Sequence, residues 1–181
     1  MYDVITMGSA TIDVFVDTDI RSLLLDHKKI IGYPSGTKIL IKNITFGTGG
    51  GGTNTAVGFS RMGFRTGYVG KVGEDANGKS ILEMLKREKV TFLGSRGKEP
   101  TGYSIILDSR ERERTILFYK GVNDKLDIKE INLKRIKSRF FYLSSMLGKS
   151  FIAAKKIIKH LKRHNTAIAF NPSIYLIRKG K

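Results

Sequence analysis

A glycine-rich segment at residues 47–54 reads Gly-Thr-Gly-Gly-Gly-Gly-Thr-Asn and lies between a pattern typical of a strand and one typical of a helix. Glycines at such a place let the backbone approach a ligand closely, and free amides at the start of a helix can donate hydrogen bonds to ligand oxygens. The same residues are also compatible with a tight strand-to-helix turn that binds nothing. The segment is therefore a candidate binding loop.

Two polar side chains accompany this loop. Asp13 lies in a predicted strand directly after the small-residue turn at 8–10, and Asn54 ends the glycine-rich segment. A carboxylate accepts hydrogen bonds from two hydroxyl groups at once, and an amide side chain both donates and accepts. The alternative is that Asp13 is an ordinary surface charge at the edge of a strand, with no ligand. Taken with the loop, the pattern favours a site for a compound that carries several hydroxyl groups.

A second candidate loop at residues 73–80, Gly-Glu-Asp-Ala-Asn-Gly-Lys-Ser, matches the phosphate-loop pattern G-x-x-x-x-G-K-S/T. In a true phosphate loop the amides up to Gly78 would surround the phosphates, Lys79 would pair with the outer ones and Ser80 would hold magnesium. Two acidic residues within the loop oppose a polyphosphate. The alternative is an ordinary loop in which Asp75 favours the start of the next helix. A P-loop nucleotide-binding protein is thus a rival reading.

Positive charge is concentrated in the last third of the chain. The formal net charge is +17, and residues 131–181 contain 13 Lys and Arg but no Asp or Glu. Such a cluster could bind nucleic acid or another polyanion, face an acidic partner, or form a solvated surface. Residues 151–161 favour the last reading, because apolar residues repeat there at helical spacing and the lysines lie off that stripe. No DNA- or RNA-binding motif accompanies the charge, so a non-enzymatic cationic binding module is the weaker alternative.

Several classes of protein are disfavoured by composition. The absence of cysteine rules out disulfides and thiolate metal sites, and His27, His160 and His164 have no metal-ligand spacing, so we expect no metal site. No apolar run reaches the roughly 20 residues that a membrane helix needs. We therefore expect a cytoplasmic protein without a membrane anchor.

Alternation of strand and helix patterns predicts an α/β fold with a doubly wound, mostly parallel sheet and helices on both faces. Residues 11–17, 37–46 and 102–120 instead alternate between apolar and polar residues, which suits a small separate sheet. Residues 18–36 are expected to be irregular. The expected strands are residues 2–8, 11–17, 37–46, 66–72, 90–94, 102–108, 114–120, 139–145 and 166–170, and the expected helices are residues 54–62, 76–89, 127–137 and 150–164.

The motifs together resemble those of the ribokinase-like (PfkB) carbohydrate kinase family. The matching segments are GSATID at 8–13, GTGGGGTNTAVGFSRMG at 47–63, GYVGKVGEDANGKSILEMLK at 67–86, TGYSIIL at 101–107 and FNPS at 170–173. The resemblance implies a doubly wound α/β domain with a β-sheet lid, which phosphorylates a hydroxyl group of a sugar or nucleoside with ATP and magnesium.

The same resemblance assigns substrate contacts to Asp13, Gly50, Gly51 and Asn54. Ribokinase has a lysine at the position of Gly51, which argues against ribose as the substrate. The resemblance also places the catalytic base and the nucleotide pocket in the second half of the fold, on a Gly-Ala-Gly-Asp motif. No G-x-G-D occurs in this sequence, so the chain carries no catalytic residue of its own.

We therefore expect residues 1–181 to be the N-terminal, substrate-binding part of such a kinase, with a lid built from residues 11–17, 37–46 and 102–120. The chain alone should be inactive, since ATP and Mg²⁺ would be bound by the complete enzyme. The expected partners are a sugar or nucleoside and either a second copy joined through the lid or a separate C-terminal half. Nucleic acid and membrane are not expected partners.

Overall fold

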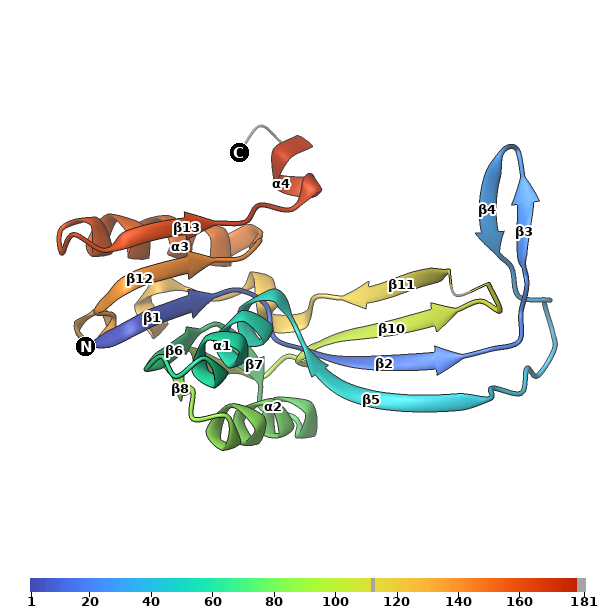
Figure 1. The fold of residues 1–181 in the computed structure, drawn as a ribbon, viewed down its shortest axis with the longest axis horizontal. Coiled ribbons are helices and arrows are strands. Elements are labelled where there is room, and N and C mark those ends of the chain that lie inside the picture. The colour runs from blue at the N-terminus through green and yellow to red at the C-terminus, as the bar shows by residue number, and fades with distance from the viewer. Residues whose placement is uncertain (112, 179–181) are drawn as a thin grey trace. The chain divides into compact units, whose positions relative to one another are not determined.

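The computed structural model describes residues 1–111 and 113–178 and has the α/β organisation expected from the sequence (Figure 1). The strands are β1 (Tyr2–Met7), β2 (Thr11–Asp17), β3 (Ser22–Leu25), β4 (Lys28–Ile31), β5 (Asn43–Gly49), β6 (Thr66–Val69), β7 (Lys71–Gly73), β8 (Thr91–Phe92), β9 (Ser95–Gly97), β10 (Gly102–Asp108), β11 (Arg114–Tyr119), β12 (Ser138–Leu143) and β13 (Ala167–Phe170). The α-helices are α1 (Gly51–Arg61), α2 (Ala76–Arg87), α3 (Gly148–Lys162) and α4 (Ile174–Arg178).

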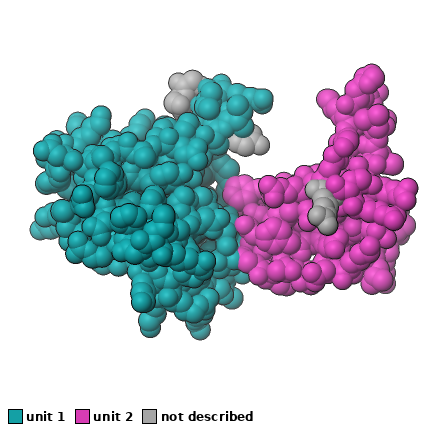
Figure 2. All heavy atoms as spheres, viewed as in Figure 1, with its two compact units in different colours: residues 1–12, 48–102, 120–181 teal, residues 13–47, 103–119 magenta. Residues whose placement is uncertain are grey.

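The chain divides into two compact units, coloured separately in Figure 2. Unit 1 comprises residues Met1–Ile12, Thr48–Gly102 and Lys120–Lys181. Its main sheet has the strand order β13-β12-β1-β6-β8, and each neighbouring pair is parallel. A non-sequential order of parallel strands joined through helices is the doubly wound arrangement, so the predicted fold class is confirmed.

The two faces of the main sheet are covered by different helices. Side chains alternate along β1, so Ile5 and Met7 point to one face while Val4 and Thr6 point to the other. Ile5 and Met7 belong to a buried core with Phe141 of β12 and with the apolar side of α3. On the opposite face the Thr6 hydroxyl donates a hydrogen bond of 2.9 Å to the Gly52 carbonyl of α1.

Helix α3 forms where its apolar residues repeat at helical spacing. Ala154 and Leu161 are buried and Phe151 and Ile158 are half-buried, whereas the lysines between them are exposed. The predicted division of this segment into an apolar stripe and a cationic surface is therefore confirmed.

Unit 2 comprises Asp13–Gly47 and Tyr103–Tyr119. It holds most of a sheet with the order β11-β10-β2-β5, in which β10 and β11 pair in antiparallel fashion. The strands expected outside the parallel sheet thus form a separate small sheet. The start of its fourth strand is corrected from residue 37 to Asn43, because residues 37–42 form no strand.

The segment expected to be irregular at 18–36 contains a hairpin, so that prediction is wrong. β3 and β4 pair in antiparallel register around a two-residue turn, Asp26-His27, whose φ angles are 48° and 62°. Positive φ at both central residues is the geometry that joins two strands with the natural twist. Asp and His tolerate this left-handed conformation better than most residues.

The helix predicted at 127–137 is also wrong. The structure has two short 3-10 turns there, Ile128–Glu130 and Leu133–Arg135. The Asp127 carboxylate accepts from the Lys129 amide, and the Asn132 side chain accepts from the Lys134 amide. These local side-chain bonds satisfy amides that a continuous helix would use, so each turn begins anew.

Candidate functional site

The start of α1 is shaped by close contacts between backbones. Gly50 caps the helix with a φ of 107°, a conformation that other residues rarely adopt. A Cβ atom at Gly52 would lie 2.7 Å from three backbone atoms of Gly8, and a Cβ at Gly8 would meet Gly52 at a similar distance. The glycines therefore let the first turn of α1 rest directly on the turn that follows β1.

The first amides of α1 are occupied by Ser9. Its hydroxyl accepts from the Gly51 amide at 3.2 Å, and its carbonyl accepts from the Gly52 and Thr53 amides at 3.1 and 3.4 Å. The expectation of free amides at this helix start is therefore wrong for residues 51–53. Ser9, which the sequence analysis treated only as part of a small-residue turn, therefore accepts the hydrogen bonds of the first amides of this helix, whose N-cap residue is Gly50.

Ser144 is a second residue that sequence reasoning missed. It follows β12, and its amide donates to the Met7 carbonyl at 2.8 Å, which brings the carboxyl ends of β1 and β12 together. Its hydroxyl occupies the space where a side chain at Gly51 would begin. A serine directly after an apolar strand was the available signal, since ligands of open α/β sheets bind at the carboxyl ends of the strands.

Asn54 and Asp13 lie on different units. Asn54 is exposed at the end of the first turn of α1, and its backbone amide donates to the Gly50 carbonyl at 2.9 Å. Asp13 is half-buried on β2 and is the first residue of unit 2. The structure thus brings Gly50, Gly51 and Asn54 together in unit 1.

The turn that leads to β2 is held by Asn123, a buried residue that the sequence analysis did not single out. The Asn123 side chain accepts from the Ala10 amide and donates to the Ala10 carbonyl, both at 2.9 Å. Ala10 is fully buried, so these are the bonds that satisfy its backbone groups. Asn123 therefore positions the turn between β1 and the strand that carries Asp13.

The loop at residues 73–80 is held by hydrogen bonds to the carboxylate of Asp75, which lies within it. Asp75 caps α2, accepting from the Gly78 amide at 2.8 Å and from both the amide and the hydroxyl of Thr101. Burial opposes ionisation of this carboxyl, but these hydrogen bonds outweigh it and lower its pKa below the ordinary value. The capping role expected as the alternative to a phosphate loop is confirmed.

The side chains that a phosphate loop would use are committed elsewhere or turned to solvent. Lys79 is exposed and lies 4.0 Å from Glu83 on the same helix, and the Ser80 hydroxyl donates to the Ala76 carbonyl at 3.0 Å. The Gly78 amide, which a phosphate loop would offer to a phosphate, donates to the Asp75 carboxylate instead. Nothing in this geometry favours nucleotide binding at residues 73–80.

No metal-ligand set is present in the described part of the chain. Within residues 1–111 and 113–178, no three His, Cys, Asp or Glu side chains converge in a way that could hold an ion. Across the same residues, no helix is both long enough and apolar enough to span a bilayer.

Comparison with known proteins identifies what the chain is similar to. The family described as pfkB family carbohydrate kinase matches residues 1–178. The 5-dehydro-2-deoxygluconokinase of Clostridium perfringens is 28% identical over 180 residues, which cover 94% of this chain and 48% of that protein. The chain thus spans about half the length of this curated relative.

Solved structures share the fold. Ribokinase from Giardia lamblia has a TM-score of 0.82 at 20% identity, covering 97% of this chain and 56% of that one. Arabidopsis thaliana ribokinase, solved in complex with ribose and ATP, has a TM-score of 0.72 at 23% identity, covering 93% of this chain and 53% of that one. At these identities the likeness concerns the fold.

Proposed function

The chain belongs to the pfkB family of carbohydrate kinases, and on that premise we propose that it provides the acceptor-binding half of an ATP-dependent kinase for a sugar or nucleoside. The observation that carries this proposal is the start of α1. There, at the carboxyl ends of β1 and β12, a helix begins on glycines alone, with serine hydroxyls and an exposed asparagine beside it. In open α/β sheets this end of the strands is where ligands bind.

The polar groups at this place suit hydroxyl groups of an acceptor. Asn54 can donate to one oxygen of a polyol and accept from another, and the hydroxyls of Ser9 and Ser144 can do the same. A Cβ atom at positions 50–52 would clash with Ser9, Ser144 or Gly8, so this helix start requires glycine. The family resemblance adds Asp13, whose two carboxylate oxygens would accept from two hydroxyls of the same acceptor.

The contribution of this chain to phosphoryl transfer is positioning. Holding the reacting hydroxyl in one place removes much of the entropic cost of the reaction. The base, the magnesium ion and the nucleotide would be held by the second half of the fold, because this chain has no G-x-G-D motif. The family resemblance assigns the strands expected at residues 11–17, 37–46 and 102–120 to a lid, which would exclude water during the reaction.

Calorimetric titration of the chain with ribose, 5-dehydro-2-deoxygluconate, fructose and adenosine tests the proposal. We expect one class of acceptor to bind, and Asp13→Asn or Asn54→Ala to weaken that binding about tenfold to a hundredfold, the effect of losing hydrogen bonds of this kind. Asp26→Asn, at the tip of the β3–β4 turn, and Asn77→Ala, in the first turn of α2, are the matched controls and should bind normally. Equal binding by all four variants would remove the assignment.

A further inference from the structure

The outer surface of α3 is lined with positive charges. Six exposed residues of this helix and its C-terminal cap share that surface: Lys149, Lys155, Lys156, Lys159, Lys162 and Arg163. At about 3.6 residues per turn they fall on one side of the helix, opposite the buried Ala153, Ile157 and Leu161. We call these six residues the cationic face.

The charges of the cationic face are not paired with carboxylates in the described part of the chain. Several cations elsewhere in unit 1 have such partners, among them Arg61 with Glu88, Lys71 with Glu130 and Lys120 with Asp124. Across residues 1–111 and 113–178, no salt bridge involves a residue of the cationic face. The Lys155 ammonium lies 5.4 Å from the centre of the Phe151 ring, a contact that leaves its positive charge in place. This charge is therefore available to a partner.

The sequence explains why these charges stay unpaired, because residues 131–181 contain no Asp or Glu. Asp127, which comes earlier in the chain, is an acidic neighbour of the face. The pKa of its carboxyl is lowered chiefly by a hydrogen bond from a nearby backbone amide and further by the positive charges of Lys149 and Lys156. The N-terminal end of the cationic face is thus partly compensated by Asp127, and the C-terminal end carries the stronger positive charge.

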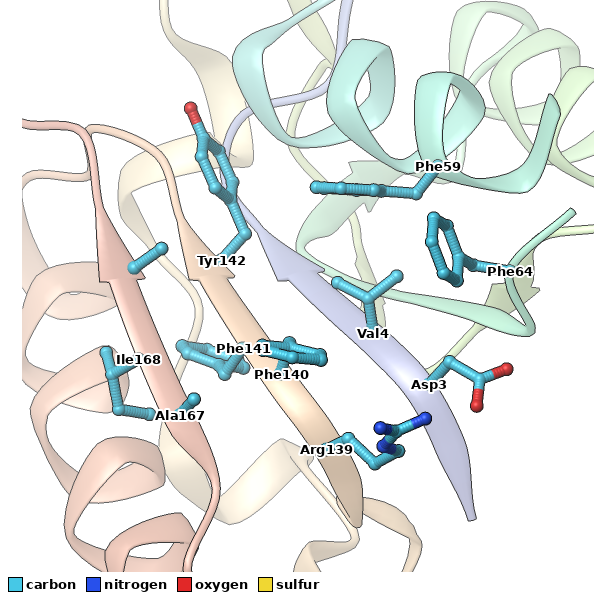
Figure 3. Close-up of a pocket in the computed structure, with 11 residues that line it drawn as sticks. Asp3, Val4, Phe59, Phe64, Arg139, Phe140, Phe141, Tyr142, Ala167 and Ile168 are labelled. Carbon is cyan, nitrogen blue, oxygen red and sulfur yellow. The ribbon is translucent and has the colours of Figure 1, made fainter. Parts of the chain in front are cut away.

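The opposite face of the main sheet has a different character. Figure 3 shows that face, where a hollow of about 460 Å³ is lined mostly by aromatic and aliphatic side chains. The charged residues of its lining are Asp3 and Arg139, one of each sign. A negatively charged partner would find no concentration of cations in this hollow. The attraction for such a partner therefore lies on the side of α3.

The length and composition of the cationic face indicate which polyanion it fits. From Lys149 to Arg163 the helix rises about 21 Å, at about 1.5 Å per residue. A nucleic-acid duplex presents one negative charge per about 1.7 Å of its axis, so about twelve phosphates lie along this length. Five of the six cations are lysines, whose charge sits at the end of a flexible stem and does not need the fixed geometry of a single carboxylate.

A membrane surface and a second copy of the chain fit the cationic face less well. Helices that lie in a membrane surface insert an apolar face into it. The apolar stripe of α3 is instead buried against the main sheet, and Ile152 is the one exposed apolar side chain on this helix. A second copy would bring the same positive charges together. A duplex meets neither objection.

We propose that the cationic face of α3 binds duplex nucleic acid through its phosphates, without reading the base sequence. The sequence analysis expected no such partner because no nucleic-acid-binding motif is present, but contacts to phosphate alone require no motif. The inference goes beyond the proposed function. Since α3 and the start of α1 lie on opposite faces of the main sheet, a duplex on α3 would leave the proposed acceptor site open.

Fluorescence anisotropy of a labelled DNA duplex of about 20 base pairs, titrated with the purified chain between about 50 and 200 mM KCl, tests the proposal. If all six cations contact phosphates, the logarithm of the affinity should fall against the logarithm of the salt concentration with a slope of about −5. A second duplex of unrelated sequence should bind equally. Absence of binding at the lowest salt concentration, or an affinity that salt does not change, would overturn the proposal.

A triple variant at the C-terminal end of the face, Lys159→Gln with Lys162→Gln and Arg163→Gln, should reduce the slope to about −2.5, since three contacts are lost. The matched control is Lys86→Gln with Arg87→Gln and Lys89→Gln, which removes the same three charges from the end of α2 and the residues after it. The control should keep the slope of the unaltered chain. An equal reduction in both variants would show that the duplex responds to net charge alone, and the proposal would be wrong.

Asp127→Asn gives a readout of opposite sign. The amide oxygen can still accept the hydrogen bond from the Lys129 amide, but the negative charge beside the cationic face is gone. Duplex affinity should rise about twofold to fivefold at low salt, the effect of one exposed charge pair. An unchanged or weaker affinity would contradict the placement of phosphates over this face.

Two other outcomes identify a different occupant or separate the two proposals. If the chain binds vesicles of phosphatidylglycerol but no duplex, the occupant is a membrane surface and the proposal is wrong. The duplex titration contains no acceptor, so a chain that binds a duplex but no sugar or nucleoside would contradict the proposed function and support the cationic face. A chain that binds an acceptor but no duplex would do the reverse.

Discussion

Replacement of Gly52 by alanine tests the contact on which the start of α1 depends. A Cβ at this position would lie 2.7 Å from the N, Cα and C atoms of Gly8, well inside the normal separation of about 3.5–4.0 Å between carbon atoms. Backbone atoms cannot turn aside as a side chain can, so α1 or the turn after β1 must move. Overpacking of this kind typically costs about 1–3 kcal/mol.

Gly58→Ala in the same helix is the matched control. Nothing lies within 4 Å of a Cβ at Gly58, so this variant should gain the helix propensity of alanine, about 0.5–1 kcal/mol. The propensity gain applies to both variants, so the difference between their free energies of unfolding should equal the overpacking cost, about 1–3 kcal/mol in favour of Gly58→Ala.

Urea denaturation followed by far-ultraviolet circular dichroism measures this difference directly. Gly52→Ala should unfold at a lower urea concentration than the unaltered chain and Gly58→Ala at a higher one. Gly52→Ala should also weaken acceptor binding, because the displaced helix start carries Gly51 and Asn54 with it. If the two variants have equal free energies of unfolding, the close approach of Gly52 to Gly8 does not exist and the reasoning fails.

Three further variants probe neighbouring contacts. Gly51→Ala should destabilise the chain less when Ser144→Ala is also present, because the serine hydroxyl occupies the space of the new Cβ; a double-mutant cycle in urea measures the coupling, expected at about 0.5–2 kcal/mol, and additive effects would contradict it. Asn123→Ala should cost about 2–5 kcal/mol, since it leaves the buried amide and carbonyl of Ala10 unsatisfied, and a thermal melt with an unchanged midpoint would exclude this. Asp75→Ala should lose about 1 kcal/mol near neutral pH through the lost helix cap. Burial opposes ionisation of the Asp75 carboxyl, but hydrogen bonds depress its pKa in the folded chain below the ordinary value of 3.8. Its contribution to the free energy of unfolding is therefore present above pH 3.8 and lost as the pH falls below that value. The stabilities of Asp75→Ala and of the unaltered chain should converge in urea titrations at low pH, and a constant difference would refute the link.

Much of the main sheet could be predicted because its longer strands are short runs of mostly apolar residues. Residues 2–8, 139–145 and 166–170 fall close to the observed β1, β12 and β13 for this reason. The failures came where local side-chain bonds decide the backbone. The periodicity at 127–137 is that of a helix, yet Asp127 and Asn132 each bind amides of their own turn and divide the segment.

The residues of the candidate site could be recognised from the sequence, but their hydrogen bonds could not. The glycine run and Asn54 could be recognised from composition and spacing, but the helix begins within the glycines at Gly51 and not at residue 54. Whether an amide is free depends on residues far away in sequence, and here Ser9 takes three of them. Ser144 enters the site because β12 lies beside β1, a neighbour relation that periodicity alone does not give.

The most direct test of the central claim is nuclear magnetic resonance mapping of the acceptor on the isotopically labelled chain. An acceptor bound at the start of α1 should shift the backbone amides of Ser9, Gly50–Asn54 and Ser144 and leave those of the loop at 73–80 in place. Shifts confined to that loop, or to residues away from the start of α1, would show that the acceptor binds elsewhere and would contradict the account.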